Sequence, residues 1–392
     1  MLSRDRYLET AIKEDLEKKM AFIGGPRQVG KTTLARRLGD AASHAVYLNW
    51  DFQPHRLAIK SAHWKPETDL LILDEVHKFP RWKNLVKGIW DTKSENMRII
   101  VTGSSRLDTF RRGGDSLQGR YHAYRLHPFS LREVNNLNPP DDLSATSLSD
   151  FPEALTGLVD LQRWGGFPEP FLAGNDRQWR RWRRERFDRV FREDIRDTEL
   201  VRALGQVELL AALMPPRIGS PVSIRSLSED VEASPKTVQS WLDLLCRNYY
   251  LFRVPPWHRR LDRALRKESK YYFWDWAEAP EGGQRFENMV AGHLLKFCHY
   301  AQDVFGWRVE LYYVRDREKR EVDFLVVWEQ QPLVLVECKS RPDRMYTSAA
   351  YFARKLGVKA AYVVTLDDKA DYVERKNGVR VIPASRFLSG LV

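Results

Sequence analysis

The sequence predicts an α/β protein with more than one domain, and three observations lead to this class. The chain has 392 residues, too many for a single compact core, so we expect two or three domains. Short apolar segments alternate with helical stretches in its N-terminal part. The same alternation returns in the C-terminal part, after a mainly helical middle region. Short apolar strands separated by helices are typical of parallel sheets that are covered on both faces.

The first predicted sheet consists of four apolar runs, at residues 21–25, 44–51, 69–75 and 97–103. A segment rich in Pro, Ser and Asp, residues 138–152, marks a domain boundary. We therefore expect a parallel-sheet domain in 1–145, a helical and winged-helix region in 150–260, and a second α/β domain in 265–392.

The composition is that of a globular protein, with 43% hydrophobic and 30% charged residues. No apolar run reaches the ~20 residues that a membrane span needs, and the N-terminus is charged, so we expect neither a membrane span nor a signal peptide. Cys246, Cys298 and Cys338 form no C-x-x-C pair, which favours a reducing, cytoplasmic location over disulfides or a zinc site. The net charge of +11 is compatible with a polyanionic partner but is weak evidence alone.

The segment GPRQVGKT, residues 25–32, fits the pattern G-x-x-x-x-G-K-[ST] between an apolar strand and a helix. Its glycines permit a tight loop whose backbone N–H groups face phosphates, next to the positive end of the helix dipole. Lys31 would neutralise the charge of the β- and γ-phosphates of ATP, and the Thr32 hydroxyl would hold Mg²⁺. The predicted loop residues are Gly25, Pro26, Arg27, Gln28, Val29, Gly30, Lys31, Thr32 and Thr33.

Two acidic residues end the apolar run DLLILDE. Asp74 would reach the Mg²⁺ ion through water, and Glu75 would polarise the water that attacks the γ-phosphate. The alternative is a strand end that carries solvated acids. After the run MRIIVTG, Ser104 or Ser105 would act as a polar sensor near the γ-phosphate.

Two further residues belong to the same part of the sequence. Arg120, in SLQGRYHAY, is a candidate stabiliser of transition-state charge, within its own chain or on a neighbouring one, and a purely structural role fits equally well. His77 has no partner at the spacing of metal ligands, so we interpret it as a local hydrogen-bonding residue.

The stretch RQWRRWRRERFDRVFR, residues 177–192, carries eight Arg and two acidic residues. Arginines with aromatic residues between them suit contact with a nucleic-acid backbone. Trp179, Trp182 and Arg186 also follow an i, i+3, i+7 stripe, which would place the aromatic residues in a core and leave the arginines solvated. Both interpretations stay open.

Residues 217–255 have the order of elements of a winged helix, a unit that either reads a DNA groove or serves only for packing. Its second helix would run from about Pro235 to Arg247, with Thr237, Gln239 and Ser240 as exposed polar residues.

The segment EVDFLVVWEQQPLVLVECKS, residues 321–340, consists of two apolar runs around a polar turn. If the turn is centred on Gln330, facing residues have numbers that sum to about 660, so Asp323 lies opposite Glu337 on the same face of the sheet. Lys339 follows Glu337 by two positions and shares this face. Both faces are otherwise apolar, which indicates a hairpin covered on both sides.

Paired carboxylates in such a place are costly unless a cation compensates them. Mg²⁺, or Mn²⁺ in its place, would do so and leave room for water and a phosphate, while Lys339 would orient or activate the water. Glu287, near the start of the amphipathic stretch 286–297, would add a third oxygen ligand to Asp323 and Glu337. The alternative is a charged strand end at which Lys339 simply pairs with an acid.

Taken together, the chain resembles a prokaryotic family of AAA-type ATPases with a C-terminal domain of unknown function. The resemblance rests on GPRQVGKTTLA, LLILDEVHK, VTGSS, SLQGR…HPFSLRE, GGFPEPFL, FRED, the winged-helix stretch and EVDFLV…LVECKS, in this order. It implies an AAA-type P-loop ATPase domain, a winged-helix-like linker and a restriction-endonuclease-like domain with a PD-(D/E)xK core. Here the leading position of that core reads EVD in place of PD.

The residues and the resemblance support three hypotheses. The first is a cytoplasmic, Mg²⁺-dependent ATPase coupled to a nucleic-acid-binding domain that cleaves DNA. Such a protein could act as a homo-oligomer. The second is an ATP-controlled, DNA-binding switch whose nuclease-like domain is catalytically inactive. The third is a protein-remodelling ATPase, which would form a ring and would not bind DNA.

Overall fold

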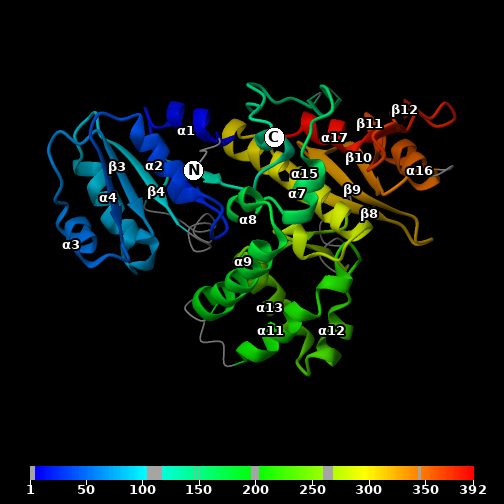
Figure 1. Ribbon diagram of the computed structural model, residues 1–392, viewed down its shortest axis with the longest axis horizontal. Helices are drawn as coiled ribbons and strands as arrows, with labels where there is room; N and C mark the ends of the chain where they lie inside the picture. The colour runs from blue at the N-terminus through cyan, green and yellow to red at the C-terminus, as the bar shows by residue number, and fades with distance from the viewer. Residues whose placement is uncertain are drawn as a thin grey trace. The chain divides into compact units, whose positions relative to one another are not determined.

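The computed structural model describes residues 5–103, 117–145, 147–149, 151–195, 203–258, 268–342 and 346–392. These residues form two compact units, 5–127 and 128–392, which we call the first and the second unit (Figure 1). The regions 150–260 and 265–392, predicted as two domains, both lie in the second unit. Among the helices described here, none is both long enough and apolar enough to cross a membrane.

The first unit contains a five-stranded sheet with the order β2-β3-β4-β1-β5, in which all neighbouring strands are parallel. The strands are β1 (Met20–Gly24), β2 (Ala45–Asn49), β3 (Leu70–Asp74), β4 (Arg98–Thr102) and β5 (Tyr121–Arg125). β1 and β3 are buried along their whole length, as strands covered on both faces must be. The predicted parallel sheet is confirmed.

Helices cover both faces of this sheet. They are α1 (Glu9–Asp15), α2 (Lys31–Asp40), α3 (Gln53–Ser61), the 3₁₀ turn η1 (Val76–Lys78) and α4 (Trp82–Thr92). α3 and α4 bury Ile59, Val86 and Ile89 against the face that carries Phe22 and Leu73. α2 packs against β3 and β4 from the other side, where Gly39 lies next to Ile72. The carboxyl ends of the strands therefore form one edge, from which the loops leave the sheet.

β5 is a strand that the apolar pattern does not indicate. Its sequence, YHAYR, contains no apolar run, and four of its five residues are only partly buried. A strand at the edge of a sheet is covered less than a central one, so hydropathy alone does not detect it.

The middle of the second unit is mainly helical. Its elements are α6 (Leu131–Val134), η3 (Ser147–Ser149), α7 (Leu158–Trp164), α8 (Pro168–Ala173), α9 (Asp176–Arg189), the π-helical turn η4 (Val190–Ile195), α11 (Leu204–Ala212) and η5 (Pro215–Arg217). α8 begins with a proline at its first position, within the stretch GGFPEPF that the sequence analysis assigns to a loop.

Two helices and a hairpin come next, in the order that a winged helix requires. They are α12 (Ile224–Asp230), α13 (Pro235–Arg247), and the antiparallel strands β6 (Leu251–Val254) and β7 (Lys270–Phe273), followed by η6 (Trp276–Glu278). The Ser234 side chain caps α13 by accepting a hydrogen bond from the Thr237 N–H, as the sequence Ser-Pro indicates. The winged-helix assignment itself stays a prediction.

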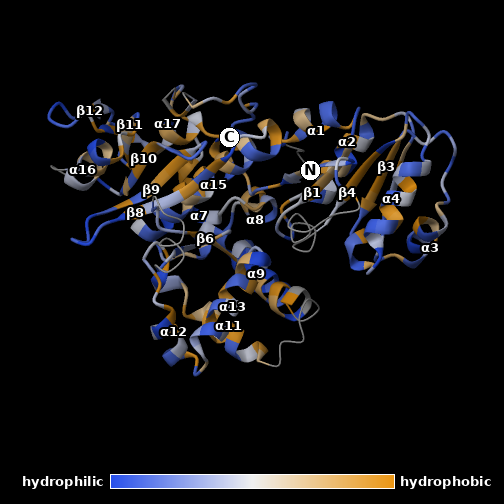
Figure 2. Cartoon of the chain, turned by 180° about the vertical axis from the view of Figure 1, so that it is seen from behind, coloured by the Kyte–Doolittle hydropathy of each residue, from blue (hydrophilic) through white to orange (hydrophobic). Residues whose placement is uncertain are grey.

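The C-terminal sheet has six strands in the order β12-β13-β11-β10-β9-β8. They are β8 (Val309–Arg315), β9 (Glu321–Trp328), β10 (Gln331–Lys339), β11 (Ala360–Thr365), β12 (Tyr372–Val373) and β13 (Arg380–Pro383). The accompanying helices are α15 (Gly283–Phe305), α16 (Thr347–Leu356), α17 (Ala384–Phe387) and η7 (Leu388–Gly390). Figure 2 shows hydrophobic residues concentrated along the strands of both sheets.

The hairpin β9–β10 lies inside this sheet, between β8 and β11. Its turn consists of Glu329 and Gln330, both at positive φ, as a two-residue hairpin turn requires. Val334 pairs with Val326, and Val336 with Phe324, so the predicted sum of 660 is confirmed for these pairs.

α16 covers one face of the hairpin, which we call the α16 face; it carries Val322, Leu325, Val327 and Leu335. We call the opposite face, against which α15 packs, the α15 face.

A buried polar network joins α6 to α15. The Lys296 ammonium donates to the Glu133 carboxylate and to the Ser130 hydroxyl, at 3.1 Å for the latter. The His293 ring accepts the Leu131 N–H through Nε2 at 3.1 Å, while Nδ1 contacts the Met289 carbonyl at 2.8 Å. Burial lowers the pKa of His293 to about 4, so this imidazole is neutral in the folded protein at pH 7.

This network predicts a loss of stability in mild acid. An unfolded histidine has a pKa of about 6.5, so below this pH the unfolded chain binds a proton that folded His293 does not bind. Between pH 7 and pH 5 this difference costs about 2 kcal/mol of the free energy of unfolding. We expect His293→Gln to show a smaller pH-dependent loss in urea unfolding than the wild type. His299→Gln, on the same helix, should keep the loss, and equal pH dependence of wild type and His293→Gln would contradict the prediction.

Candidate functional site

The loop after β1 has the backbone of a phosphate-binding loop. Gly25 and Gly30 adopt φ values of 145° and 102°, which favour glycine. A Cβ atom on Gly25 would lie 2.5 Å from the Leu126 carbonyl oxygen, so the loop has no room for a side chain there. The Lys31 ammonium lies inside the loop, where it donates to the carbonyls of Gly25 and Pro26 at 2.9 and 2.7 Å. The first turn of α2 starts at Lys31, as the motif predicts.

Polar side chains from β2, β3, β4 and α2 meet at Asp74. The Thr32 hydroxyl donates to Asp74 Oδ2 at 3.0 Å, and the Tyr47 hydroxyl donates to the same oxygen at 2.5 Å. Thr102, paired with Asp74 in the sheet, donates to Oδ1. The structure thus brings the predicted residues Thr32 and Asp74 together and adds Tyr47 and Thr102, for which the sequence carries no motif.

Glu75 directly follows Asp74 and has a left-handed backbone, with φ of 57°. Its N–H donates to the Thr102 carbonyl at 3.0 Å, which continues the pairing with β4, and its left-handed backbone then turns the chain away from the strand direction. Burial, together with the charge of Asp74, raises the pKa of Glu75, although Lys31 and Lys78 oppose this shift. A carboxylate with a raised pKa is better matched to accepting a proton near pH 7.

His77 is buried next to this carboxylate, with Nε2 at 3.6 Å from Glu75 Oε2. Gly103 lies against the His77 ring, since a Cβ atom there would be 2.3 Å from Nδ1. The ring therefore supports the Glu75 loop, in agreement with its interpretation as a local residue. The predicted sensors Ser104 and Ser105 lie outside the described residues.

Arg120 lies at the opposite edge of the sheet from the loop. It precedes β5, whose first residue Tyr121 pairs with Met20 at the start of β1, whereas the loop follows the end of β1. Five residues of strand span roughly 16 Å. The Arg120 guanidinium forms an ion pair with Asp91, with Nε at 3.0 Å from Oδ1. The prediction that Arg120 contacts the phosphates of a nucleotide bound by its own chain is therefore wrong. A role at a nucleotide bound by a neighbouring chain stays a prediction.

A β-bulge changes the direction of Asp323. β8 pairs Tyr312 with Leu325 and Val314 with Val322, so the two residues Asp323 and Phe324 lie opposite a single residue of β8. In a regular strand Asp323 would share the α16 face with Leu325. With the extra residue, Asp323 lies on the α15 face, where its Oδ2 accepts the Cys338 N–H at 2.9 Å.

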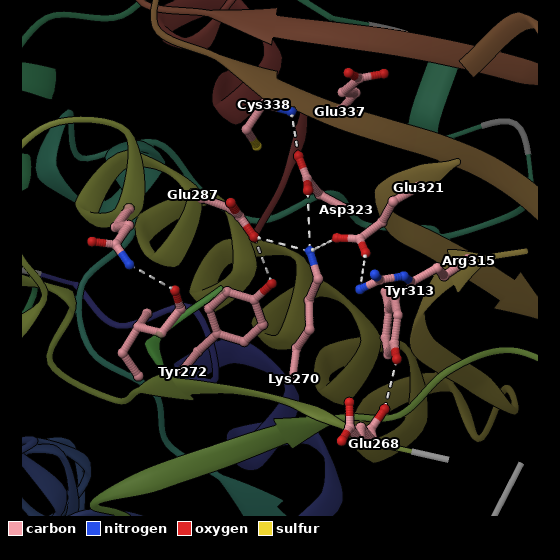
Figure 3. A network of polar contacts seen from close by, with 12 residues as sticks. Glu268, Lys270, Tyr272, Glu287, Tyr313, Arg315, Glu321, Asp323, Glu337 and Cys338 are labelled. Carbon is pink, nitrogen blue, oxygen red and sulfur yellow. Dashed lines mark hydrogen bonds and ion pairs between the residues drawn. The ribbon is translucent and has the colours of Figure 1, made fainter. Parts of the chain in front are cut away.

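Three carboxylates and one lysine meet on the α15 face (Figure 3). The Lys270 Nζ lies 2.8 Å from Glu321 Oε1, 3.2 Å from Asp323 Oδ1 and 3.4 Å from Glu287 Oε1. The side chain of Lys270 is only 1% exposed, and the carboxylates are 17–25% exposed. We call Glu287, Glu321 and Asp323 the acid cluster. Of these, Glu321 and the central Lys270 are absent from the sequence prediction.

The electrostatics of the cluster follow from this arrangement. Burial lowers the pKa of Lys270, but the charges of Asp323, Glu287 and Glu321 outweigh it and raise the pKa well above the ordinary value. Burial also raises the pKa of Glu287, to about 8, and the charge of Asp323 adds to the shift. The Tyr272 hydroxyl donates to Glu287 Oε1 at 2.8 Å and opposes it. Lys270 is therefore a permanent cation in this site.

The structure does not bring Glu337 to the other predicted metal ligands. Figure 3 shows its carboxylate turned away from Asp323, Glu287 and Lys270. Glu337 follows Leu335 by two positions and so points to the α16 face, where its Oε1 lies 3.0 Å from Lys339 Nζ. The expected shared face of Asp323 and Glu337 is not found, because the bulge reverses one of the two. No group of three metal-type side chains suited to a metal ion occurs in the described ranges.

Helix α9 has one buried side and one side exposed to solvent. Trp182 and Arg186 are 2% exposed, and Arg186 Nη1 donates to Glu278 Oε1 at 2.6 Å. The residues that we call the outer arginines are exposed: Arg177, Arg180, Arg181, Arg183 and Arg184. The interpretation as a core stripe therefore holds for Trp182 and Arg186, and the outer arginines form a basic surface.

Three family models match the chain. A model described as an AAA domain matches residues 17–135. Two models described as domains of unknown function, DUF8612 and DUF4143, match residues 156–277 and 282–387.

Similar proteins occur in distant prokaryotes. An uncharacterized protein of Methanocaldococcus jannaschii is 22% identical over 393 residues, covering 91% of this chain and 86% of the relative. An uncharacterized protein of Haemophilus influenzae is 24% identical over 360 residues, covering 83% and 84%. An uncharacterized protein of Mycobacterium tuberculosis is 21% identical over 257 residues, covering 65% and 54%.

Two solved structures are similar at a more distant level. The Walker-type ATPase paby2304 of Pyrococcus abyssi matches 68% of this chain and 92% of its own, with 14% identity and a TM-score of 0.41. A RuvB protein of Thermotoga maritima matches 63% and 87%, with 17% identity and a TM-score of 0.32.

The first unit thus combines the AAA-domain match with a five-stranded parallel sheet and a glycine-bounded loop that leads into α2. Residues 17–135 thus match an AAA-domain model and have the sheet and the loop of a P-loop domain.

Proposed function

We propose that the first unit binds and hydrolyses ATP in a Mg²⁺-dependent reaction, and that this reaction controls the binding of nucleic acid by the second unit. The observation that carries the first part is the meeting of Lys31, Thr32, Asp74 and Glu75 at the carboxyl edge of one parallel sheet. In open α/β sheets, ligands bind at this edge.

The residues at this edge fit a nucleotide phosphate and a metal ion. The loop has no room for a side chain at Gly25, so its backbone is free to approach a phosphate closely. Lys31 places an ammonium in the loop, and the Thr32 hydroxyl and Asp74 carboxylate, 3.0 Å apart, are oxygen donors of the kind Mg²⁺ prefers. When bound, Mg²⁺ neutralises the charge that develops on the phosphate oxygens.

Glu75 would take the role of the general base. Its backbone turns it out of β3 beside Asp74, and burial raises its pKa towards the working range of a base. Lys78 and His77 hold its Oε2 at 3.6 Å each, which limits the positions that the carboxylate adopts.

Two substitutions test this assignment. We expect Lys31→Ala to lower ATP hydrolysis by at least about 100-fold and to weaken nucleotide binding, since it removes a charge from the phosphates. Glu75→Gln should lower kcat to a similar extent but keep nucleotide affinity, because it removes only the base. A fluorescent ATP analogue and a phosphate-release assay measure the two quantities.

The control is Lys18→Ala, an exposed lysine in the same unit, which should leave both quantities unchanged. Full ATP hydrolysis by purified Lys31→Ala protein would refute the assignment.

Tyr47 provides a separate test of the metal site. Its hydroxyl donates to the Asp74 oxygen that Thr32 also contacts, so it orients a carboxylate that would face Mg²⁺. Loss of such a supporting contact typically costs 10–100-fold in metal affinity. We expect Tyr47→Phe to raise the Mg²⁺ concentration needed for half-maximal hydrolysis by at least about tenfold, with a smaller change in kcat at saturating Mg²⁺. An unchanged Mg²⁺ dependence would show that Tyr47 does not support a metal site.

For the second unit, the outer arginines of α9 support nucleic-acid binding. Five exposed guanidinium groups lie on one helix, and their inner neighbour Arg186 is held by Glu278, which anchors the helix. Arginine is well suited to phosphate contact because its planar fork binds two oxygens. The hydrophilic colouring of α9 in Figure 2 agrees with a solvated surface.

Two hypotheses describe the step after nucleic-acid binding. Cleavage by a PD-(D/E)xK site would require Asp323, Glu337 and Glu287 around one metal ion. The switch without cleavage is favoured here by one observation: Lys270 lies among the carboxylates, and Glu337 is paired with Lys339 on the other face. We therefore propose a nucleotide-controlled, nucleic-acid-binding switch, and keep the nuclease as the alternative.

DNA binding and cleavage assays separate these hypotheses. We expect the double substitution Arg180→Glu, Arg184→Glu to weaken DNA binding and to make the slope of log K against log salt less steep by about 2, because two phosphate contacts are lost. Arg354→Glu, an exposed arginine on α16, is the matched control. We also expect no cleavage of plasmid, single-stranded or branched DNA with Mg²⁺ or Mn²⁺, with or without ATP. Cleavage that Asp323→Asn abolishes would establish the nuclease and refute the switch.

A further inference from the structure

We propose that the ammonium of Lys270 is the resident cation of the acid cluster, in place of the divalent metal that a nuclease core would hold there. In this role Lys270 fastens the β6–β7 hairpin to the C-terminal sheet and helix α15. The proposal concerns the second unit alone and does not depend on ATP hydrolysis in the first.

The geometry of the cluster matches an ammonium group. An ammonium has three donors, and Lys270 Nζ has one carboxylate oxygen from each of three residues within 3.4 Å. Two of the remaining oxygens have donors of their own. Arg315 Nη1 donates to Glu321 Oε2 at 3.2 Å, and the Cys338 N–H donates to Asp323 Oδ2 at 2.9 Å. Protein groups thus donate to both oxygens of Glu321 and Asp323 and to Oε1 of Glu287.

Lys270 is also held firmly in this position by its backbone. It is the first residue of β7, where it pairs with Val254 of β6 and forms a bridge with Pro221. Three residues later, the Phe273 N–H and carbonyl both bond to the Asn288 side chain of α15, at 2.9 Å each. These contacts fix the backbone of β7, from which the Lys270 side chain reaches the acid cluster, so the position of the cation belongs to the folded state.

The same contacts leave no place for a metal ion. A metal ion would have to occupy the space between Glu287, Glu321 and Asp323, and Nζ fills this space. Gly219 closes one side, because a Cβ atom there would lie 2.9 Å from Glu287 Oε1. Glu337, which a nuclease core would require beside Asp323 and Glu287, points to the α16 face. The residues present therefore do not fit a metal-dependent nuclease.

The proposal predicts that removal of the ammonium creates a metal site. Without Lys270 the three acids are left close together, and only Glu321 keeps a cation, Arg315. A divalent ion with oxygen ligands is the species that compensates such a group best. We expect Lys270→Ala to acquire a Mn²⁺ site at the acid cluster. Its affinity for Mn²⁺ should be at least about tenfold higher than that of the same region in the wild type.

The experiment uses the full chain without nucleotide and titrates Mn²⁺ by electron paramagnetic resonance. Lys270→Ala should bind one more Mn²⁺ ion than the wild type, and Mn²⁺ should raise its temperature of unfolding. The added substitution Asp323→Asn should abolish both effects. Lys359→Ala, an exposed lysine of the same unit, is the matched control and should behave as the wild type.

The wild type itself supplies a second test, which holds even if Lys270→Ala does not fold. Asp323→Asn in the otherwise unchanged chain should leave the number of bound Mn²⁺ ions as it is. A Mn²⁺ ion that binds the wild type and is lost in Asp323→Asn would overturn the proposal, since the acids would then exchange Lys270 for a metal. A folded Lys270→Ala protein that gains no Mn²⁺ site would overturn it as well.

Discussion

The arrangement of the second unit depends on the contacts of one buried ammonium with three acidic side chains. Lys270 comes from β7, Glu287 from α15, and Glu321 and Asp323 from β9, so a single charge joins a hairpin, a helix and a sheet. Loss of one partner from a buried ion pair is strongly destabilising, because it leaves an uncompensated charge. In this chain one ammonium contacts three acids, of which Glu321 also contacts Arg315. The interaction therefore determines the relative positions of elements that lie far apart in the sequence.

The central strands and the loop of the first unit could be predicted from the sequence, because their signals are local. The apolar runs that become β1 to β4 are contiguous, and the loop motif places Lys31 and Thr32 on a helix that follows a strand. Tyr47 and Thr102 could not be found in this way, since they reach Asp74 only through the order of strands in the sheet. The position of Arg120 depends on β5, a strand with no apolar run.

For the second unit, the same reasoning gave the correct register of the β9–β10 hairpin but the wrong face of the sheet for Asp323. Counting from the turn gave the correct pairing of β9 with β10, because a two-residue turn and apolar runs on both sides leave few alternatives. The bulge at Asp323 depends on β8, a strand that the hairpin sequence does not contain. Lys270 precedes Asp323 by 53 residues and belongs to another hairpin, so no spacing rule connects the two.

Because of the β-bulge, very few mutations separate the present site of the C-terminal sheet from a different one. One inserted residue in β9 determines whether Asp323 lies on the face of Lys270 or on the face of Glu337. Two small changes would therefore convert this site. Removal of the extra residue from β9 would place Asp323 beside Glu337, and removal of the Lys270 amine would leave the acids without the ammonium that now occupies the cluster. Between two such states, a change of chemistry requires no change of fold.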